Sequence, residues 1–111
     1  LKKVGINCTI ADARFAKPFD RDLILDVSKK NKAILIVEEG SIGGFASHIL
    51  NFLANNNLIS DSFRVSSLML PDRFIDHKNQ AEQILESNLD RKSIFKKVCK
   101  ILNKNQYLSA V

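Results

Sequence analysis

The sequence has few of the residue types that mark specialised protein classes. Tryptophan is absent, and the 111 residues include one tyrosine, one methionine, two prolines, four glycines and two cysteines. Cys8 and Cys99 lie far apart and form no Cys-x-x-Cys spacing, which excludes a zinc framework and a disulfide-dense secreted scaffold. No apolar run reaches the roughly 18–20 residues needed to cross a bilayer, and no signal-peptide pattern opens the chain. We expect reduced thiols, a cytoplasmic location and no membrane partner.

Aromatic residues that stack on bases are scarce beside the positive charge. The net charge of +5 would suit an anionic partner such as a nucleic acid. In the last predicted helix, however, the lysines fall between the apolar positions, as on a solvated face: Lys92, Lys96, Lys97, Lys100 and Lys104. Basic and aromatic residues do not interleave as they do in surfaces that bind single strands. We therefore expect no nucleic-acid partner.

The composition is that of an ordinary globular domain. Hydrophobic residues make up 45% of the chain and charged residues 26%, so the chain has enough apolar side chains to form a core. Its length allows one domain, which we assign to residues 1–104, followed by a tail at 105–111. The first residue is Leu1 and the only methionine is Met69, so we expect this chain to be a piece of a longer polypeptide.

Strand and helix patterns alternate along the chain. Residues 33–37 (AILIV) are an unbroken apolar run, which is typical of a strand covered on both faces in a parallel sheet. The alternation in residues 6–13 and the apolar run in 63–70 predict two further strands. Helix start signals occur at Asp20, at Ser41 with the following glycines, at Asn79 and at Asp90. The predicted fold is α/β, a three-layer αβα arrangement with a mainly parallel sheet. Since three strands make a small sheet, we expect a first strand and helix upstream of Leu1.

The glycine-rich turn 40–44 follows the central strand and precedes a helix, an arrangement that many folds use to bind phosphate. Its spacing matches neither Gly-x-Gly-x-x-Gly nor a P-loop, and it lacks the first glycine of a nucleophile elbow. Glu38 and Glu39 would also repel a phosphate there. We therefore expect the glycines to serve close packing, with Glu39 capping helix amides or meeting a cation across an interface.

The two histidines have no cysteine or carboxylate at metal-ligand spacing. His48 is predicted to be an ordinary helix residue. His77 lies in the segment 72–77, where we expect Asp72, Arg73 and Asp76 to bond one another and the backbone and so order a loop. No dense cluster of titratable residues predicts a self-contained acid–base site.

Three segments resemble a known enzyme family. ADARFAKPFD (11–20), ILIVEEGSIGGFASHI (34–49) and LPDRFIDH (70–77) are similar to the C-terminal domain of 1-deoxy-D-xylulose-5-phosphate synthase, in the thiamine-diphosphate-dependent transketolase group. The paired glutamates and glycines are shared with transketolases and the β subunits of 2-oxoacid dehydrogenases, whereas LPDRFIDH favours the synthase. The resemblance covers nearly the whole chain up to the last helix.

The resemblance implies a parent transferase that condenses pyruvate with glyceraldehyde 3-phosphate, releasing carbon dioxide, at the start of the non-mevalonate pathway of isoprenoid biosynthesis. It also implies thiamine diphosphate, Mg²⁺ and a homodimer. In this family the first two domains hold the cofactor and the catalytic glutamate, so the resemblance places no catalytic, cofactor-binding or metal-binding residue in this chain.

The role left for this domain is structural. We expect it to be inactive alone and to contact the other domains of its polypeptide and a second subunit. The candidate interface residues are Glu38, Glu39, Gly43, Gly44, Asp72, Arg73 and His77. Two alternatives stay open: the same domain of a transketolase or a 2-oxoacid dehydrogenase β subunit, and a free-standing α/β binding or regulatory module.

Overall fold

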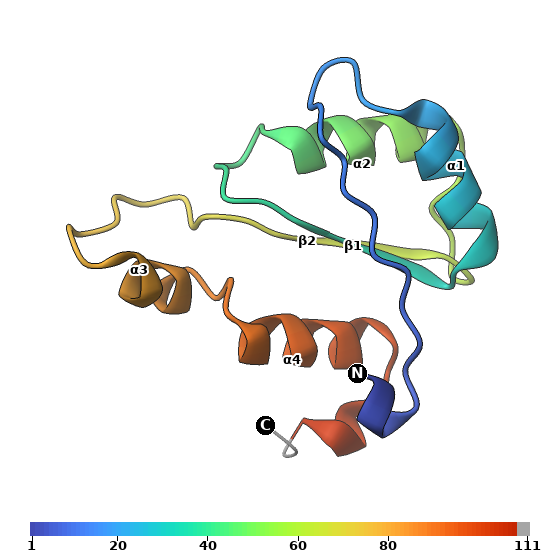
Figure 1. Cartoon of the computed structure of the whole chain (residues 1–111). Coiled ribbons are helices and arrows are strands. Elements are labelled where there is room, and N and C mark those ends of the chain that lie inside the picture. The colour runs from blue at the N-terminus through green and yellow to red at the C-terminus, as the bar shows by residue number, and fades with distance from the viewer. Residues whose placement is uncertain (109–111) are drawn as a thin grey trace.

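A computed structural model describes residues 1–108 as an α/β fold (Figure 1). The predicted end of the tail, residues 109–111, lies outside the described residues. The helices are α1 (Arg21–Lys30), α2 (Phe45–Asn55), α3 (Gln80–Glu86) and α4 (Arg91–Ile101), the strands are β1 (Ala33–Val37) and β2 (Arg64–Leu68), and two 3₁₀ turns are η1 (Lys2–Val4) and η2 (Asn105–Tyr107).

The two strands form a parallel pair with α2 as the crossover between them. The register runs from Ala33 opposite Arg64 to Val37 opposite Leu68. Beyond the strands the backbones stay joined, because the Leu70 amide donates to the Gly40 carbonyl at 2.9 Å. Parallel strands place their carboxyl ends at one edge, so the segments that follow Val37 and Leu68 leave the sheet side by side.

Helices cover both faces of this small sheet (Figure 1). α2 lies over one face with α1 beside it, and α4 lies under the other, so the fold has the predicted three layers. The core forms between α1, α2 and the sheet, where the buried residues are Ile24, Ile36, Ala46, Ile49, Leu53 and Phe63. The apolar run predicted as the central strand therefore packs beneath the apolar stripe of α2.

Three of the four predicted helix starts are confirmed by their side-chain caps, whereas Ser41 does not cap α2, whose N-cap residue is Gly44. The Asp20 carboxylate accepts from the Leu23 amide at 2.9 Å, and the Asn79 side-chain oxygen accepts from the Glu82 amide at 3.0 Å. Asp90 accepts from the amide of Lys92 at 2.8 Å. These bonds satisfy amides that have no partner within the first helical turn, which explains why a short polar residue precedes α1, α3 and α4.

The prediction of a strand at residues 6–13 is wrong. The segment is irregular: Ile6 is buried, but Ile10 is 92% exposed. Figure 1 shows it crossing the direction of the sheet, from η1 beside α4 up to α1, rather than running along β1. The alternation of apolar and polar residues suits a strand, but a strand also needs a neighbour that is parallel or antiparallel to it. The described sheet therefore has two strands instead of the three predicted.

α4 is shorter and less buried than its sequence pattern predicts. The helical spacing of Ile94, Val98, Ile101 and Leu102 predicts a buried stripe that ends near Asn103, but α4 ends at Ile101 and its only buried residue is Cys99. The expected stripe is half-buried because η2 and the edge of β2 cover only part of this helix. Both cysteines are free thiols, as expected, with Cys8 exposed. Within residues 1–108 no helix is long and apolar enough to cross a membrane.

Candidate functional site at the carboxyl end of the sheet

The first residue after β1, Glu38, caps α2. Its Oε2 accepts a hydrogen bond from the Phe45 amide at 2.8 Å, and its Oε1 accepts from the Ala46 amide at 3.0 Å. The N-cap residue itself, Gly44, offers no side-chain bond. A carboxylate at this end also interacts favourably with the helix dipole. The predicted capping role is therefore correct in kind but belongs to Glu38 and not to Glu39.

The glycines of the turn make room for this carboxylate. A Cβ at Gly40 would lie 3.0 Å from Glu38 Oε2, and one at Gly44 would lie 2.8 Å from the same atom. Gly43 is a different case, because its φ of 96° is a backbone conformation that other residues rarely adopt. The predicted close packing therefore takes the form of a close approach of the Glu38 side chain to the backbone at Gly40 and Gly44.

This arrangement leaves no place for a phosphate group. The amides of Phe45 and Ala46, which an anion would use, already donate to Glu38. A diphosphate brought to the same helix end would meet a negative charge in a partly buried site. Thiamine diphosphate therefore does not fit this turn.

Glu39, the next residue, lies at a hollow beside the turn. Glu39 is exposed and lines a hollow of about 270 Å³ together with two glutamines, Gln80 and Gln83, and four aliphatic residues, Leu70, Ile75, Ile84 and Leu89. None of the ion pairs among residues 1–108 includes Glu39. The hollow lies where the segment after β2 passes α3, so the same edge of the sheet carries the glycine turn and this hollow.

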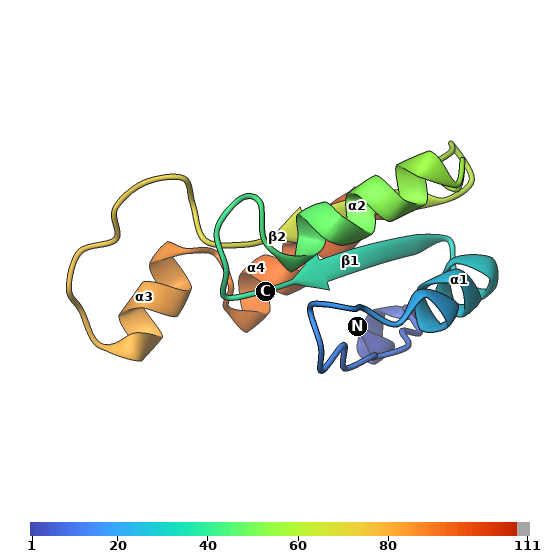
Figure 2. The ribbon, with the colours of Figure 1, turned by 90° about the horizontal axis from the view of Figure 1, so that it is seen from above.

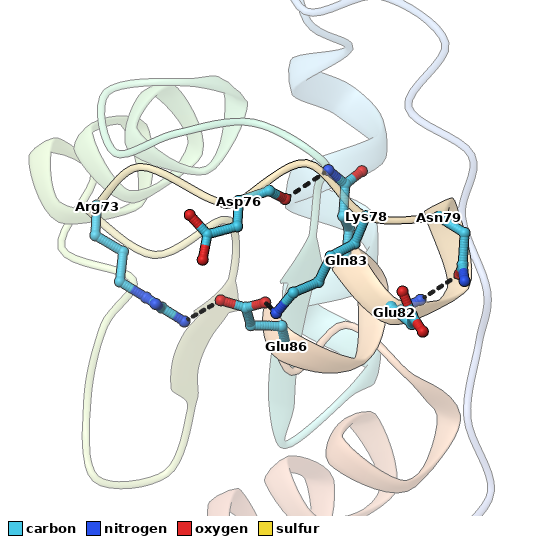
Figure 3. A network of polar contacts seen from close by, with 7 residues as sticks. All are labelled: Arg73, Asp76, Lys78, Asn79, Glu82, Gln83 and Glu86. Carbon is cyan, nitrogen blue, oxygen red and sulfur yellow. Dashed lines mark hydrogen bonds and ion pairs between the residues drawn. The ribbon is translucent and has the colours of Figure 1, made fainter.

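The segment 72–79 is fastened to α3 by three polar contacts (Figure 3). Arg73 Nη2 lies 2.7 Å from Glu86 Oε1, and Lys78 Nζ lies 2.6 Å from Glu86 Oε2. The Gln83 side-chain amide donates to the Asp76 carbonyl at 3.2 Å. The loop is ordered, as predicted, but by these bonds to α3 and not by bonds among Asp72, Arg73 and Asp76.

Glu86 is the centre of this network, and its charge is stabilised there. The hydrogen bond from Lys78 and the positive charges of Lys78 and Arg73 hold the pKa of Glu86 below its ordinary value, against partial desolvation. The same hydrogen bond and the charge of Glu86 raise the pKa of Lys78. Both groups are therefore charged across the neutral range, and the two ends of the loop are held to one carboxylate.

The loop is expected to loosen in acid. Because the folded pKa of Glu86 is lowered, its stabilising effect is present above the ordinary carboxyl pKa near 4.5 and is lost as the pH falls through the lower folded value. The effect of Lys78 has the opposite sign, being lost only as the pH rises above 10.5. The protection factors of the amides of residues 72–79, which correct the exchange rates for the pH dependence of intrinsic exchange, should fall in acid and, at neutral pH, in Glu86→Gln.

Glu82→Gln, on the same helix but outside the network's ion pairs, is the matched control and should leave these exchange rates unchanged. An NMR titration of the Glu86 carboxyl checks the same point. A midpoint at or above the ordinary value, or equal exchange in both variants, would contradict the fastening of the loop by Glu86.

The sequence of this chain matches a known family over most of its length. The matching model is described as transketolase, C-terminal domain, and it covers residues 1–94. The chain belongs to this family. The match includes the glycine turn, the 72–79 loop and α3, and it ends within the first turn of α4.

The remaining predicted residues of this transketolase C-terminal domain lie at the surface. Asp72 and His77 are both exposed on the loop, and His48 is half-buried in α2. Among residues 1–108 there is no group of three or more histidine, cysteine, aspartate or glutamate side chains that could hold a metal ion. The structure thus gathers Glu39, Arg73 and His77 on loops at one end of the sheet without forming a reactive cluster.

Sequence reasoning missed the loop's partner on α3. Glu86 lies in the last turn of α3, where an acidic residue opposes the negative end of the helix dipole. An acid in that position is a signal that it has a cationic partner. Lys78, eight residues earlier, and Arg73, thirteen residues earlier, were the available cations.

Proposed function

We propose that this chain is the structural and interface domain of a thiamine-diphosphate-dependent transferase, and that the parent enzyme is 1-deoxy-D-xylulose-5-phosphate synthase. Membership of the transketolase C-terminal domain family supports the first part. The segment LPDRFIDH, which forms the fastened loop, supports the second. The parent would act in the cytoplasm as a homodimer with Mg²⁺ and thiamine diphosphate, and would supply isoprenoid precursors.

The proposed interface role rests on what occupies the carboxyl end of the sheet. In open α/β sheets this edge is where ligands bind. Here the helix amides are capped internally by Glu38, and the neighbouring loop ends in exposed residues with no set of catalytic groups. At this edge the amides that could bind an anion already donate to Glu38, and the exposed loop is held to α3. Such a surface suits contact with another protein better than catalysis.

Two measurements test this role. Calorimetric titration of thiamine diphosphate with Mg²⁺ into the 111-residue chain should give no saturable heat, and the chain should not convert pyruvate and glyceraldehyde 3-phosphate. The coding sequence upstream of Leu1 should encode the cofactor-binding domains. Saturable cofactor binding or turnover by the chain alone would contradict the proposal, and a start codon close to Leu1 would favour the free-standing module.

The choice of parent enzyme needs its own assay. The full-length protein should form 1-deoxy-D-xylulose 5-phosphate from pyruvate and glyceraldehyde 3-phosphate. Ketol transfer between sugar phosphates instead would identify a transketolase, and reductive acyl transfer with partner subunits would identify a 2-oxoacid dehydrogenase. Either result would exclude the synthase as the parent enzyme and would leave the proposed interface role unchanged.

A further inference from the structure

The positive charge of this chain is concentrated in its last helix and the turn after it. The whole chain has 17 Lys and Arg residues and 12 Asp and Glu residues, a net charge of +5. Six of the basic residues and none of the acidic ones lie beyond position 90, so residues 1–90 carry 11 basic and 12 acidic residues, a net charge of −1. The six are Arg91, Lys92, Lys96, Lys97, Lys100 and Lys104. A charge asymmetry of this kind indicates an anionic partner at the charged end.

Three of these lysines form an exposed row along α4. Lys92, Lys96 and Lys100 follow one another at intervals of four residues, and all three are exposed. Residues four apart lie on the same side of a helix, with a rise of about 6 Å between them. Figure 1 shows α4 on the side of the sheet opposite α2, and in Figure 2, seen from above, the strands lie over it. The lysine row therefore lies on the helix that forms the outer layer on this side of the fold.

The described part of the chain does not balance the charge of the lysine row. The ion pairs among residues 1–108 use Lys30, Arg73 and Lys78 as their cations, and none includes a lysine of the row. Like charges four residues apart on a helix repel each other, so the row destabilises the helix that carries it. The family match ends at residue 94, so family membership does not account for charges that lie mainly beyond it. The counter-charge is to be sought on another molecule.

The surroundings of the lysine row favour a protein over a nucleic acid or a lipid surface. Proteins that bind single strands stack bases on exposed rings, but the nearest aromatic residues, Phe95 and Tyr107, are half-buried. Helices that lie on membranes insert apolar side chains, yet none of the large hydrophobic side chains exposed among residues 1–108 lies on α4. Charges along one strand of a duplex follow at about 3.4 Å, closer than the rise of about 6 Å in the row.

We propose that the lysine row docks an acidic α-helix of another protein, one in which Asp or Glu recurs at every fourth residue. Carboxylates at that interval have the same rise of about 6 Å, so two helices that lie side by side can pair each lysine with one carboxylate. Long charged side chains pair in this way along the flanks of coiled coils. This surface is separate from the carboxyl end of the sheet, and the proposal goes beyond the proposed function because it does not depend on the parent enzyme.

The contact is tested by titrating the 111-residue chain, labelled with ¹⁵N, with a synthetic peptide. The peptide is a helical alanine-rich sequence with glutamate at every fourth position, which places its carboxylates in one row. Because exposed ion pairs are individually weak, we expect a dissociation constant of roughly 0.1–1 mM in a buffer of about 20 mM salt. The largest amide shift changes should fall on α4, and about 500 mM salt should abolish them.

Neutralising the lysine row should weaken this binding without unfolding the chain. The triple variant K92Q/K96Q/K100Q is expected to raise the dissociation constant about 10-fold or more, because it removes three ion pairs. Its melting temperature should not fall, since the substitutions remove repulsion between neighbouring lysines. A loss of binding together with an unchanged or higher melting temperature therefore assigns the effect to the contact itself.

Two matched controls separate the row from net charge. The triple variant K17Q/K29Q/K32Q makes the same change of net charge at three exposed lysines elsewhere in the chain, and it should alter the dissociation constant by less than about twofold. A second peptide has the same composition and helicity, but its glutamates are distributed around the helix. It should bind about fivefold or more weakly, because fewer carboxylates face the row at one time.

A chain that does not bind the first peptide would overturn the proposal. Equal binding of the two peptides, or equal losses in the two triple variants, would also overturn it, since net charge would then explain the attraction. Tighter, row-dependent binding to a DNA duplex of about 20 base pairs, or to vesicles containing phosphatidylserine, would overturn it in favour of a phosphate ligand. A start codon close to Leu1 would remove the proposed function and leave the docking of an acidic helix unaffected.

Discussion

Replacing Leu53 by alanine is expected to lower the free energy of unfolding by about 2–5 kcal/mol. Leu53 is fully buried in α2, within the cluster formed with Ile24, Ile36 and Phe63. The substitution removes apolar contacts and leaves a cavity that the surrounding helix and sheet can only partly close. Because a small domain has little stability to lose, the melting temperature should fall by about 10 °C or more.

Leu85→Ala is the matched control, since it makes the same chemical change on α3 at a side chain that is 63% exposed. It should change the unfolding free energy by less than about 0.5 kcal/mol. Both variants are compared by urea denaturation followed by circular dichroism. Equal losses in the two would contradict a core centred between α2 and the sheet.

Replacing Glu38 by alanine is expected to cost about 1–3 kcal/mol of unfolding free energy. The carboxylate accepts from the amides of Phe45 and Ala46, and its removal leaves both without their acceptor at the start of α2. Glu39→Ala, at the neighbouring exposed acid, should stay within about 0.5 kcal/mol of the parent chain. A cost that was equal for the two glutamates would assign the effect to net charge and not to the cap.

The glycine beside this carboxylate gives a double-mutant test of the same contact. Gly44→Ala places a methyl group 2.8 Å from Glu38 Oε2, so it should destabilise the chain. In Glu38→Ala that oxygen is gone, and the same Gly44→Ala change should cost about 1–2 kcal/mol less than in the parent. Additive losses in denaturant unfolding would show that the glycine does not serve the approach of Glu38.

Local signals in the sequence predicted the bounds of β1 and three of the helix starts well, but in the described two-stranded sheet β1 lies at an edge and not at the centre. Three helices are capped by Asp20, Asn79 and Asp90, each of which accepts from an amide two or three residues away. Both partners of such a bond lie within a short stretch of sequence, so the bond can be predicted from that stretch. The run AILIV matches the bounds of β1, because five consecutive apolar residues between polar ones leave little choice of where the strand begins and ends, although only Ile36 of the five is buried.

Contacts between distant segments were predicted less well. Whether residues 6–13 form a strand depends on a neighbour alongside β1, and the chain instead crosses from η1 to α1. Which of two adjacent glutamates caps α2 depends on the path of the turn between them and the helix. Arg73 finds its partner thirteen residues away on α3, beyond the range of any local pattern.

The sequence by itself determined the α/β class, the caps of α1, α3 and α4, the bounds of β1, and the absence of a local phosphate-binding motif, because each rests on residue type and short-range spacing. The tertiary structure alone decided that Glu38 occupies the helix end, that Glu86 holds the loop, and that a hollow lined by both aliphatic and polar side chains lies between the loop and α3. The physical reason is the same in all three cases: side chains meet across separate elements, and only their positions in space determine which partners lie within reach.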